Sequence, residues 1–388
     1  MRYMIPLGEV AEFINGAAFK PEDWHENGRK IIRIQNLNDS SKPYNLTTRN
    51  VDKKYEVNTG DILVSWSASL GVFEWLEMET AWLNQHIFKA IPDKAKVHKN
   101  YFKYSLGKAL NDMECYLHGA TMKHVNRKEF LSTKIYVPPL EEQRRIAAIL
   151  DKADGVRRKR KEAIRLTKEL LRSTFLEMFG DPVTNPKGWR KISLGELLAE
   201  PLQNGAYFPK ERYVEAPDGV EMVHMSDAFY NFVERGQLKR VQVTSEESEK
   251  YKLIPNDVLI ARRSLNYEGS AKPCLISEAD QPLIFESSLI RVRLNAEVID
   301  SFFFFSYMLE PRARSAYVFP NVTKSTISGI NQAGLRRISV LVPPMSNQKK
   351  YRDIYKKILG TQSNYQKDYE NIDNLFNSLL QRAFRGEL

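Results

Sequence analysis

The sequence predicts two α/β (α+β) globular domains of related sequence, joined by two long α-helices that form an antiparallel coiled coil with pseudo-two-fold internal symmetry. Three observations lead to this fold class. The chain has 388 residues, more than one hydrophobic core usually supports. A Pro-Pro junction occurs twice, about two hundred residues apart. A long stretch with helical spacing and almost no Gly or Pro follows each junction.

The repeated junction reads "YVPPLEEQRRI" at 136–146 and "LVPPMSNQKKY" at 341–351. Both copies place a Gln four positions after the second Pro, followed by two basic residues. Other segments repeat in the same order: Leu-Gly-Glu at 7–9 and 194–196, "GDIL" at 60–63 beside "NDVL" at 256–259, and "NYFKYSL" at 100–106 beside "SFFFFSY" at 301–307. Each half is far longer than a solenoid repeat, so this order indicates duplication of whole domains.

The part of each half before its junction mixes short β-rich runs, such as 30–34 and 61–65, with turn residues. This texture is typical of a compact α/β or α+β domain. After the junction the composition changes: between Glu141 and Phe179 there is no Pro, and the only interior Gly is Gly155. Apolar residues there recur at steps of three and four, which predicts a helix.

A helix of about 37 residues would be about 55 Å long, which exceeds the width of a small domain. Its apolar seam therefore needs a partner, and the duplicate helix, which carries a heptad pattern from Tyr351 to Leu379, is the nearest candidate. The predicted organisation is a first domain, a first long helix, a second domain and a second long helix, with the boundaries 1–139, 140–179, 180–344 and 345–388.

The charge favours a polyanionic partner. The formal net charge is +10 and the sequence pI is about 9.3, which points to nucleic acid rather than to acidic proteins.

The two cysteines, Cys115 and Cys274, are far apart and suit neither a disulfide framework nor a zinc site. No run has the length of a signal peptide or membrane helix, so we expect a cytoplasmic protein without a membrane partner. Two unlike domains held apart suggest a reader of two half-sites on double-stranded DNA.

Several segments together resemble the specificity subunit of type I restriction-modification systems. They are both Pro-Pro junctions, both Leu-Gly-Glu segments, "GDILVSWSASLG" at 60–71, "LNQHIFKAIP" at 83–92 and "NSLLQRAFRGEL" at 377–388. The resemblance extends over essentially the whole chain. Each motif alone is loose, and the order and the duplication carry the specificity.

The resemblance implies that 1–139 and 180–344 are target recognition domains, each reading one half of an asymmetric bipartite DNA site. It also implies that the coiled coil sets the spacer and binds two adenine methyltransferase subunits, and that restriction subunits with motor and nuclease activity join this complex. The specificity subunit performs no chemistry and needs no cofactor. S-adenosylmethionine belongs to the methyltransferase partner, and ATP and Mg belong to the motor and nuclease partner.

Two other functions stay open at this point. The same architecture would suit a stand-alone bipartite DNA-binding regulator without an associated enzyme. A nuclease acting alone would use paired acids and a lysine around Mg²⁺, for which Glu22 or Asp23 with Asp52 and Lys54 is the best scattered match. The chain carries neither the Asn/Asp-Pro-Pro-aromatic tetrapeptide of adenine methyltransferases nor a Walker phosphate loop.

Three predicted loops in each domain combine residue types that contact phosphates or base edges. The first follows the "GDIL" strand, the second is a turn where a plain structural turn is the alternative, and the third precedes the Pro-Pro strand. In the first domain these loops contain Trp66, Ser67 and Ser69, then Asn84, Gln85 and His86, then Thr121, Lys123 and His124. In the second they contain Arg262, Arg263 and Asn266, then Ser287 and Ser288, then Thr323, Lys324, Ser325 and Thr326.

The long helices carry an apolar surplus near their ends, most of which a coiled-coil core would absorb. The rest is where we expect methyltransferase subunits to bind; the candidates are Leu171, Phe175, Met178, Phe179, Leu375, Leu379 and Phe384. The basic run Arg157–Lys161 invites a role in phosphate binding. Five consecutive helical residues point all round the axis, however, so a solvated face or a surface for an acidic subunit is at least as good an interpretation.

Overall fold

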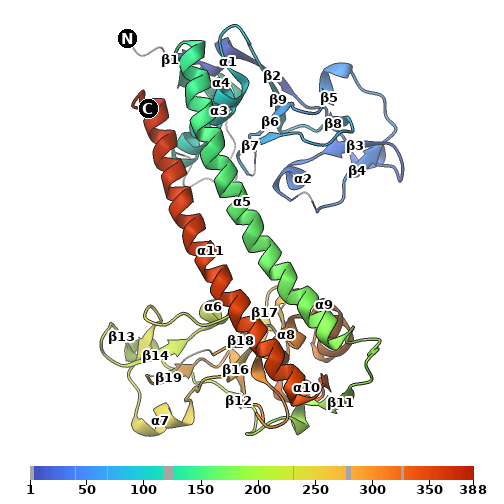
Figure 1. The fold of residues 1–388 in the computed structure, drawn as a ribbon, viewed down its shortest axis with the longest axis vertical. Coiled ribbons are helices and arrows are strands. Elements are labelled where there is room, and N and C mark those ends of the chain that lie inside the picture. The colour runs from blue at the N-terminus through green and yellow to red at the C-terminus, as the bar shows by residue number, and fades with distance from the viewer. Residues whose placement is uncertain are drawn as a thin grey trace. The chain divides into compact units, whose positions relative to one another are not determined.

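The computed structural model describes residues 4–39, 41–67, 69–116, 126–229, 231–276, 281–324 and 327–388. The chain forms two compact units (Figure 1). Unit 1 comprises Met1–Glu162 and Gln366–Leu388, and unit 2 comprises Ala163–Tyr365. Each unit therefore contains one globular part and one portion of each long helix. The four segment boundaries taken from the sequence stay a prediction.

Unit 1 is built on one antiparallel sheet, one mixed sheet and an antiparallel ribbon. The ribbon pairs β1 (Met4–Pro6) with β10 (Lys134–Tyr136). One sheet has the order β2 (Ala11–Asn15), β9 (Ile87–Pro92), β6 (Ile62–Ser65), β7 (Gly71–Glu74). The other has the order β4 (Asn45–Thr47), β3 (Arg29–Ile32), β8 (Ala81–Leu83), β5 (Glu56–Val57), with β3 and β8 parallel. The helical elements are α1 (Leu7–Val10), η1 (Pro21–Asp23), α2 (Ile34–Asn38), η2 (Lys53–Tyr55), α3 (Lys99–Tyr116) and α4 (Arg127–Ser132).

An aromatic cluster holds the first sheet of unit 1 against its helices. Phe13 of β2 packs edge-on against Phe88 of β9 and Phe130 of α4, with ring centroids 6.0 and 5.0 Å away. Phe102 of α3 lies 6.3 Å from Phe13. These rings are almost completely buried, and burial of such large apolar groups dominates the stability of a small core.

Unit 2 repeats this plan with longer connections. Its ribbon pairs β11 (Arg190–Ser193) with β22 (Ser339–Val342). Its sheets have the orders β12 (Gln203–Asn204), β20 (Leu289–Val292), β16 (Val258–Ala261), β18 (Pro273–Leu275), and β13 (Tyr213–Val214), β15 (Arg240–Val241), β14 (Val220–Val223), β19 (Leu283–Phe285). A further short ribbon joins β17 (Arg263–Ser264) to β21 (Ser328–Gly329). The helical elements are η3 (Leu194–Glu196), η4 (Lys210–Arg212), α6 (Met225–Ala228), α7 (Ser245–Lys250), η5 (Tyr267–Gly269), α8 (Ser301–Leu309), α9 (Pro311–Ala313), the π-helix η6 (Arg314–Val318), η7 (Phe319–Asn321) and α10 (Gln332–Arg336).

The duplication extends to strand register. In unit 1, β6 pairs Leu63 with Lys89, and in unit 2, β16 pairs Leu259 with Arg291. Both basic side chains are buried and both donate to a backbone carbonyl at the matching position. Lys89 Nζ lies 2.6 Å from the Glu56 oxygen, and Arg291 Nη1 lies 3.0 Å from the Lys252 oxygen. A buried cation thus ties the sheet to the residue four positions before the "GDIL" or "NDVL" segment in each unit, Glu56 of β5 or Lys252.

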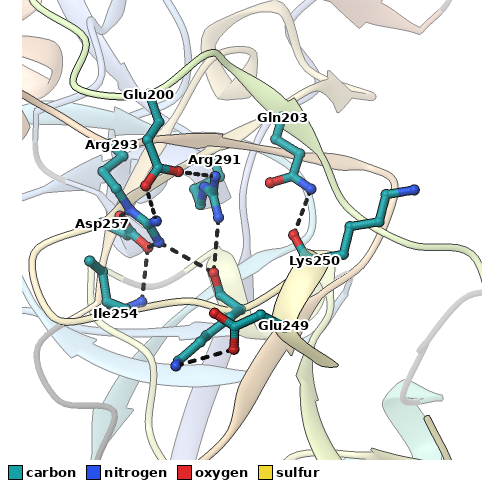
Figure 2. Close-up of polar contacts among 9 residues, drawn as sticks. Glu200, Gln203, Glu249, Lys250, Ile254, Asp257, Arg291 and Arg293 are labelled. Atoms are coloured by element: carbon teal, nitrogen blue, oxygen red, sulfur yellow. Dashed lines mark hydrogen bonds and ion pairs between the residues drawn. The ribbon is translucent and has the colours of Figure 1, made fainter. Parts of the chain in front are cut away.

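In unit 2 carboxylates neutralise Arg291 and its neighbour Arg293 (Figure 2). Arg293 donates to Asp257 and to Glu200, and Arg291 donates to Glu200 over 2.8 Å. Asp257 also accepts the backbone N–H of Ile254 at 2.9 Å. Two guanidinium groups facing two carboxylates leave no net charge, so this cluster braces the fold and has the pattern of a structural network rather than a catalytic one.

The two long helices are α5 (Leu140–Phe179) and α11 (Met345–Arg385). In unit 1 the beginning of α5 packs against the end of α11 through a buried cluster: Ile146, Ala147 and Leu150 with Phe376, Leu380 and Ala383. In unit 2 the end of α5 packs against the beginning of α11, where Phe175 and Phe179 lie 5.6 and 5.4 Å from the ring of Tyr351. The helices are therefore antiparallel in both units, and the predicted fold class is confirmed.

The basic run of α5 is largely engaged in ion pairs within unit 1. Arg157 contacts Asp154 on its own helix at 2.7 Å and Asp373 of α11 at 3.1 Å. Arg160 contacts Asp368 of α11 at 3.2 Å, and Arg158 contacts Asp154 at 3.0 Å. The sequence suggested a phosphate-binding surface, a solvated face or a surface for an acidic subunit. The ion pairs indicate a role that it did not suggest, the alignment of the two helices.

Candidate nucleic-acid interface

An Asn-Gly-Ala turn leaves the first strand of the four-stranded sheet in each unit. Ala17 donates from its backbone N–H to Leu83 and accepts from Gln85, at 2.9 and 2.8 Å. Ala206 does the same with Phe285 and Ser287, also at 2.9 and 2.8 Å. The turn therefore binds the second predicted loop, the one between β8 and β9 or between β19 and β20, by the same pair of backbone contacts.

Glycine is required at the centre of this turn. A Cβ on Gly16 would lie 2.1 Å from the carbonyl oxygen of Asn84, and a Cβ on Gly205 would lie 2.2 Å from that of Glu286. Any side chain would push the two loops apart. The segments "NGAAF" at 15–19 and "NGAYF" at 204–208 are a repeat that the sequence analysis missed, and it marks this site.

The first predicted loop joins the second loop directly. The backbone N–H of Trp66 donates to the carbonyl of His86 at 3.4 Å, and that of Arg262 donates to Ser288 at 2.9 Å. In both units the end of the "GDIL" or "NDVL" strand thus lies beside the turn that sequence reasoning had singled out separately. Loops from three different places in the chain therefore form one edge of each unit. Binding residues are often found on such loops, held in place by a rigid scaffold.

In unit 1 this edge is aromatic and polar. Trp66 stacks on Phe88 at 5.4 Å and lies 5.2 Å from the ring of His86. His86 has a backbone φ of +71°, a conformation that a non-glycine residue adopts only where its surroundings hold it. Gln85 at the tip of the turn is exposed.

The remaining predicted residues of unit 1 differ in accessibility. Ser67 is 7% exposed, so its hydroxyl offers little surface. Ser69 is half-buried and accepts a hydrogen bond from Asn38 of α2 at 2.6 Å. Asn84 is half-buried, and its Oδ1 has no hydrogen-bond partner among the described residues. Thr121, Lys123 and His124 lie outside the described residues.

In unit 2 the edge is cationic. Arg262 is half-buried and Arg263 is exposed, and neither guanidinium has a hydrogen-bond or ion-pair partner among the described residues. Strand β17 holds Arg263 opposite Gly329, and a Cβ on Gly329 would come within 2.8 Å of the Arg262 carbonyl oxygen. Asn266 is exposed, while Ser287 and Ser288 are half-buried in the adjoining turn.

The third predicted loop of unit 2 reaches the same edge. Thr323 bonds Gly329 through both backbone groups, at 2.9 and 3.2 Å. Lys324 is exposed and its Nζ lies 4.5 Å from the centre of the Tyr267 ring. Ser325 and Thr326 lie outside the described residues. The structure therefore brings Arg262, Arg263 and Lys324 to one edge of unit 2.

Two exposed apolar side chains of unit 2 escaped the sequence analysis. Leu265 is 83% exposed within the loop that follows Arg263, and Tyr207 is 82% exposed in the "NGAYF" turn. A large apolar residue between polar neighbours, as in "RRSLN" at 262–266, is the signal that could have identified Leu265.

The predicted subunit-binding residues divide into buried and accessible groups. In unit 2, Phe175 and Phe179 are core residues, and Leu171 and Met178 pack against that core. In unit 1, Leu379 and Phe384 pack against the helix-pair cluster, whereas Leu375 is 57% exposed. Other apolar helix residues are about half exposed: Val156 in unit 1, and Leu166 and Leu170 in unit 2.

The scattered acids considered for a nuclease take part in local structure. Asp23 accepts the backbone N–H of Lys20 at 2.9 Å and pairs with Arg49 at 3.1 Å, and these contacts, the backbone hydrogen bond first, lower the pKa of its carboxyl. Asp52 caps η2 by accepting the N–H of Lys54, which lowers the pKa of the Asp52 carboxyl as well.

Among the described residues no group of His, Cys, Asp or Glu has a metal-binding arrangement. None of the described helices has the length and apolar character needed to span a membrane.

Several known proteins resemble this chain over nearly their whole length. A specificity subunit of a type I restriction enzyme from Escherichia coli, EcoBI, is 22% identical, and the match covers 99% of this chain and 85% of that protein. The MjaVIII specificity subunit of Methanocaldococcus jannaschii is 24% identical over 99% of this chain and 92% of its own. The crystal structure of a type I restriction-modification S subunit from M. genitalium has the same fold, with a TM-score of 0.54, 14% identity and coverage of 98% and 96%.

The family model described as "Type I restriction modification DNA specificity domain" matches twice, at residues 3–166 and 186–372. The two matches together take in most of the chain and fall one on each repeat. By this match the chain belongs to the family of type I restriction-modification DNA specificity subunits.

Proposed function

We propose that this chain is the non-catalytic DNA-reading subunit of a type I restriction-modification enzyme, and that each unit reads one half of an asymmetric bipartite site in double-stranded DNA. The proposal rests on the edge where the three loops meet, because this edge is built in the same way in both units. The same backbone contacts hold the same loops in both units, while the side chains differ: Trp66, Gln85 and His86 in unit 1 and Arg262, Ser287 and Ser288 in unit 2. A shared frame with unlike side chains suits two half-sites of different sequence.

The long helices are proposed to set the spacer between the half-sites and to bind two methyltransferase subunits. Leu166 and Leu170 are one helical turn apart on α5 and so share a face, and both are half exposed. Leu375 of α11 is exposed in unit 1. Solvent-exposed leucines on helices whose other faces are packed support a protein-binding role.

The chemistry would reside in the partners. In this proposal the methyltransferase subunits carry S-adenosylmethionine, and restriction subunits carry ATP and Mg and join through the complex of two methyltransferase subunits with one specificity subunit. The complex would act in the cytoplasm. The alternative, a stand-alone bipartite DNA-binding regulator, uses the same edges without partners.

Co-expression with a type I methyltransferase subunit distinguishes the two. The proposal predicts a complex of one specificity chain with two methyltransferase chains, and an adenine methylation pattern with two specific half-sites around an unread spacer. Replacing Leu166 and Leu170 with Ser should weaken co-purification, whereas replacing Leu76, an exposed loop residue of unit 1, with Ser should not. A chain that binds DNA tightly and ignores the methyltransferase would favour the regulator.

The spacer is tested separately. Inserting four residues near position 160, about 6 Å of helix, should change the preferred spacer length and leave both half-site sequences unchanged. Altered half-site bases would contradict this division of labour.

A further inference from the structure

We propose that Arg263 and Leu265 of unit 2 determine specificity together: Arg263 recognises a guanine and Leu265 recognises the methyl group of a nearby thymine, both in the major groove. The inference rests on the proposed DNA-reading function and deepens it. It names the side chains and the chemical groups on the DNA that one edge discriminates.

Arg263 begins the two-residue strand β17, and Leu265 is the first residue after that strand. Along 263–265 the residues are exposed, buried and exposed in turn: Ser264 is 8% exposed, between exposed Arg263 and 83% exposed Leu265. This alternation places the side chains of Arg263 and Leu265 on the outward side and that of Ser264 on the inward side. Two residues of chain span at most about 6.6 Å, roughly twice the 3.4 Å rise of one base step, so the two side chains suit neighbouring or next-neighbouring base pairs.

The backbone that carries them is held from both sides. Arg262 donates its N–H to Ser288 at 2.9 Å and accepts from Ile330 at 3.0 Å. The N–H of Asn266 donates to the Ser264 hydroxyl at 3.1 Å, and a Cβ on Gly269 would lie 2.5 Å from that hydroxyl. The loop is therefore set before any ligand arrives, which reduces the entropy lost on binding.

A buried arginine supports the far side of the loop. Arg314 of η6 is 8% exposed, and its Nη2 donates to the carbonyls of Glu268 and Ser270 at 3.0 and 2.7 Å. Tyr267 stacks on Phe319 at 4.9 Å and donates its hydroxyl proton to the Phe319 carbonyl at 3.1 Å. The residues around Leu265 are held by these hydrogen bonds and ring contacts. The exposure of Leu265 is therefore a property of the ordered loop.

The chemistry of the two groups suits a specific pair of contacts. A guanidinium matches the O6 and N7 acceptors of guanine, and an aliphatic group matches the 5-methyl of thymine, which only the major groove displays. A single exposed leucine on a protein surface needs no explanation. Here it stands two residues from an arginine without a partner among the described residues, on the edge where three loops meet. Lys324, exposed over Tyr267, adds a cation for a phosphate.

The test uses DNA analogues that remove one recognised group at a time. The full chain in complex with its methyltransferase partner first yields the bipartite site by methylome sequencing. Duplexes are then made with 7-deazaguanine, which lacks N7, in place of each guanine, or with uracil, which lacks the methyl group, in place of each thymine. The wild-type complex should lose about 10- to 100-fold in affinity at one guanine and a smaller factor at one thymine, both in one half-site.

The protein variants then assign those losses. With Arg263→Gln the 7-deazaguanine substitution should cost nothing further, and with Leu265→Ala the uracil substitution should cost nothing further. Binding to the other half-site should respond to its own analogues as before. Arg190→Gln and Val183→Ala, which change exposed residues of unit 2 outside this edge, should leave every analogue effect in place.

Two results would overturn the inference while leaving the proposed function intact. One is a defined bipartite site whose analogue penalties are the same in the variants as in the wild type. The other is a uniform loss of affinity in Arg263→Gln with a shallower salt dependence, the mark of a phosphate contact. A complex that methylates no bipartite sequence would instead contradict the proposed function itself.

Discussion

The side-chain oxygen of Gln143 accepts a hydrogen bond from the backbone N–H of His98 at 2.8 Å. Its Nε2 donates to the carbonyls of Lys96 and Pro138 at 2.9 and 2.7 Å. Gln348 repeats this arrangement in unit 2 with the N–H of Asp300 and the carbonyls of Val298 and Pro343. The repeated Gln of the Pro-Pro junction is therefore a buried clamp that ties the first turn of each long helix to the loop before α3 or α8.

Replacing Gln348 with Leu should lower the free energy of unfolding of unit 2 by about 2–4 kcal/mol, because it leaves a buried N–H and two carbonyls without partners. Urea unfolding of the full chain, followed by a probe in unit 2, measures the change. Gln242→Leu at an exposed position of unit 2 is the matched control and should change the stability by less than about 0.5 kcal/mol. Equal effects of the two substitutions would show that the clamp contributes nothing.

Gly205→Ala should reduce DNA affinity through one half-site only. The added Cβ would lie 2.2 Å from the Glu286 carbonyl oxygen, so the turn that carries Ser287 and Ser288 must move. Gly360→Ala is the control on the same unit, since nothing lies within 4 Å of a Cβ there, and it should stabilise α11 by about 0.5–1 kcal/mol. Competition binding with duplexes altered in one half-site at a time measures the first effect. Unchanged binding by Gly205→Ala would show that this turn does not contact DNA.

Removing the Arg157 cation should leave the salt dependence of DNA binding unchanged. Its guanidinium pairs with Asp154 and Asp373 and lies 4.3 Å from the centre of the Phe376 ring, so Arg157→Gln should instead weaken the helix pair by about 1 kcal/mol. Lys324→Gln should change the slope of log K against log salt by about one unit, as loss of one phosphate contact does. If Arg157→Gln changes the slope of log K against log salt, the basic run of α5 contacts DNA phosphates after all.

The carboxylate cluster of unit 2 should make stability depend on pH. The hydrogen bond from Arg293 lowers the pKa of Glu200, so Glu200 stabilises the folded state when ionised. This contribution is present above its unfolded pKa of about 4.3 and is lost as the pH falls through the lower folded pKa. Because Glu200 is 45% exposed, Glu200→Gln should cost less than about 1 kcal/mol at pH 7 and less again at pH 3. Urea unfolding at both pH values tests this sign, and a larger cost at pH 3 would contradict it.

Local sequence patterns were sufficient to predict the fold class. The Pro-Pro pairs, the scarcity of Gly and Pro afterwards and the three- and four-residue apolar steps depend on residues close together in the chain, and the structure has a long helix, α5 or α11, after each Pro-Pro pair. The order of repeated motifs indicated the duplication. Gln143 and Gln348 were visible in that repeat, yet their role was not, because two of the three partners of each Gln lie 45 to 50 positions away.

The candidate interface was foreseen in parts. Sequence types alone suggested Trp66, His86, Arg262 and Ser288, but the backbone bonds that join Trp66 to His86 and Arg262 to Ser288 form only when distant strands pair. The roles of the basic run also depended on partners that no local pattern reveals, since Asp373 lies more than two hundred residues from Arg157.

By itself the sequence determined that the protein is a duplicated, basic, two-domain chain with two long helices, because helix and strand periods, breakers and net charge are local or additive properties. Only the tertiary structure decided which side chains are used up in the fold and which remain available. Arg157 is engaged by Asp154 and Asp373, whereas Arg263 and Leu265 are exposed on a braced loop. The physical reason is that burial and pairing arise from contacts between segments far apart in the chain, and those contacts form only on folding.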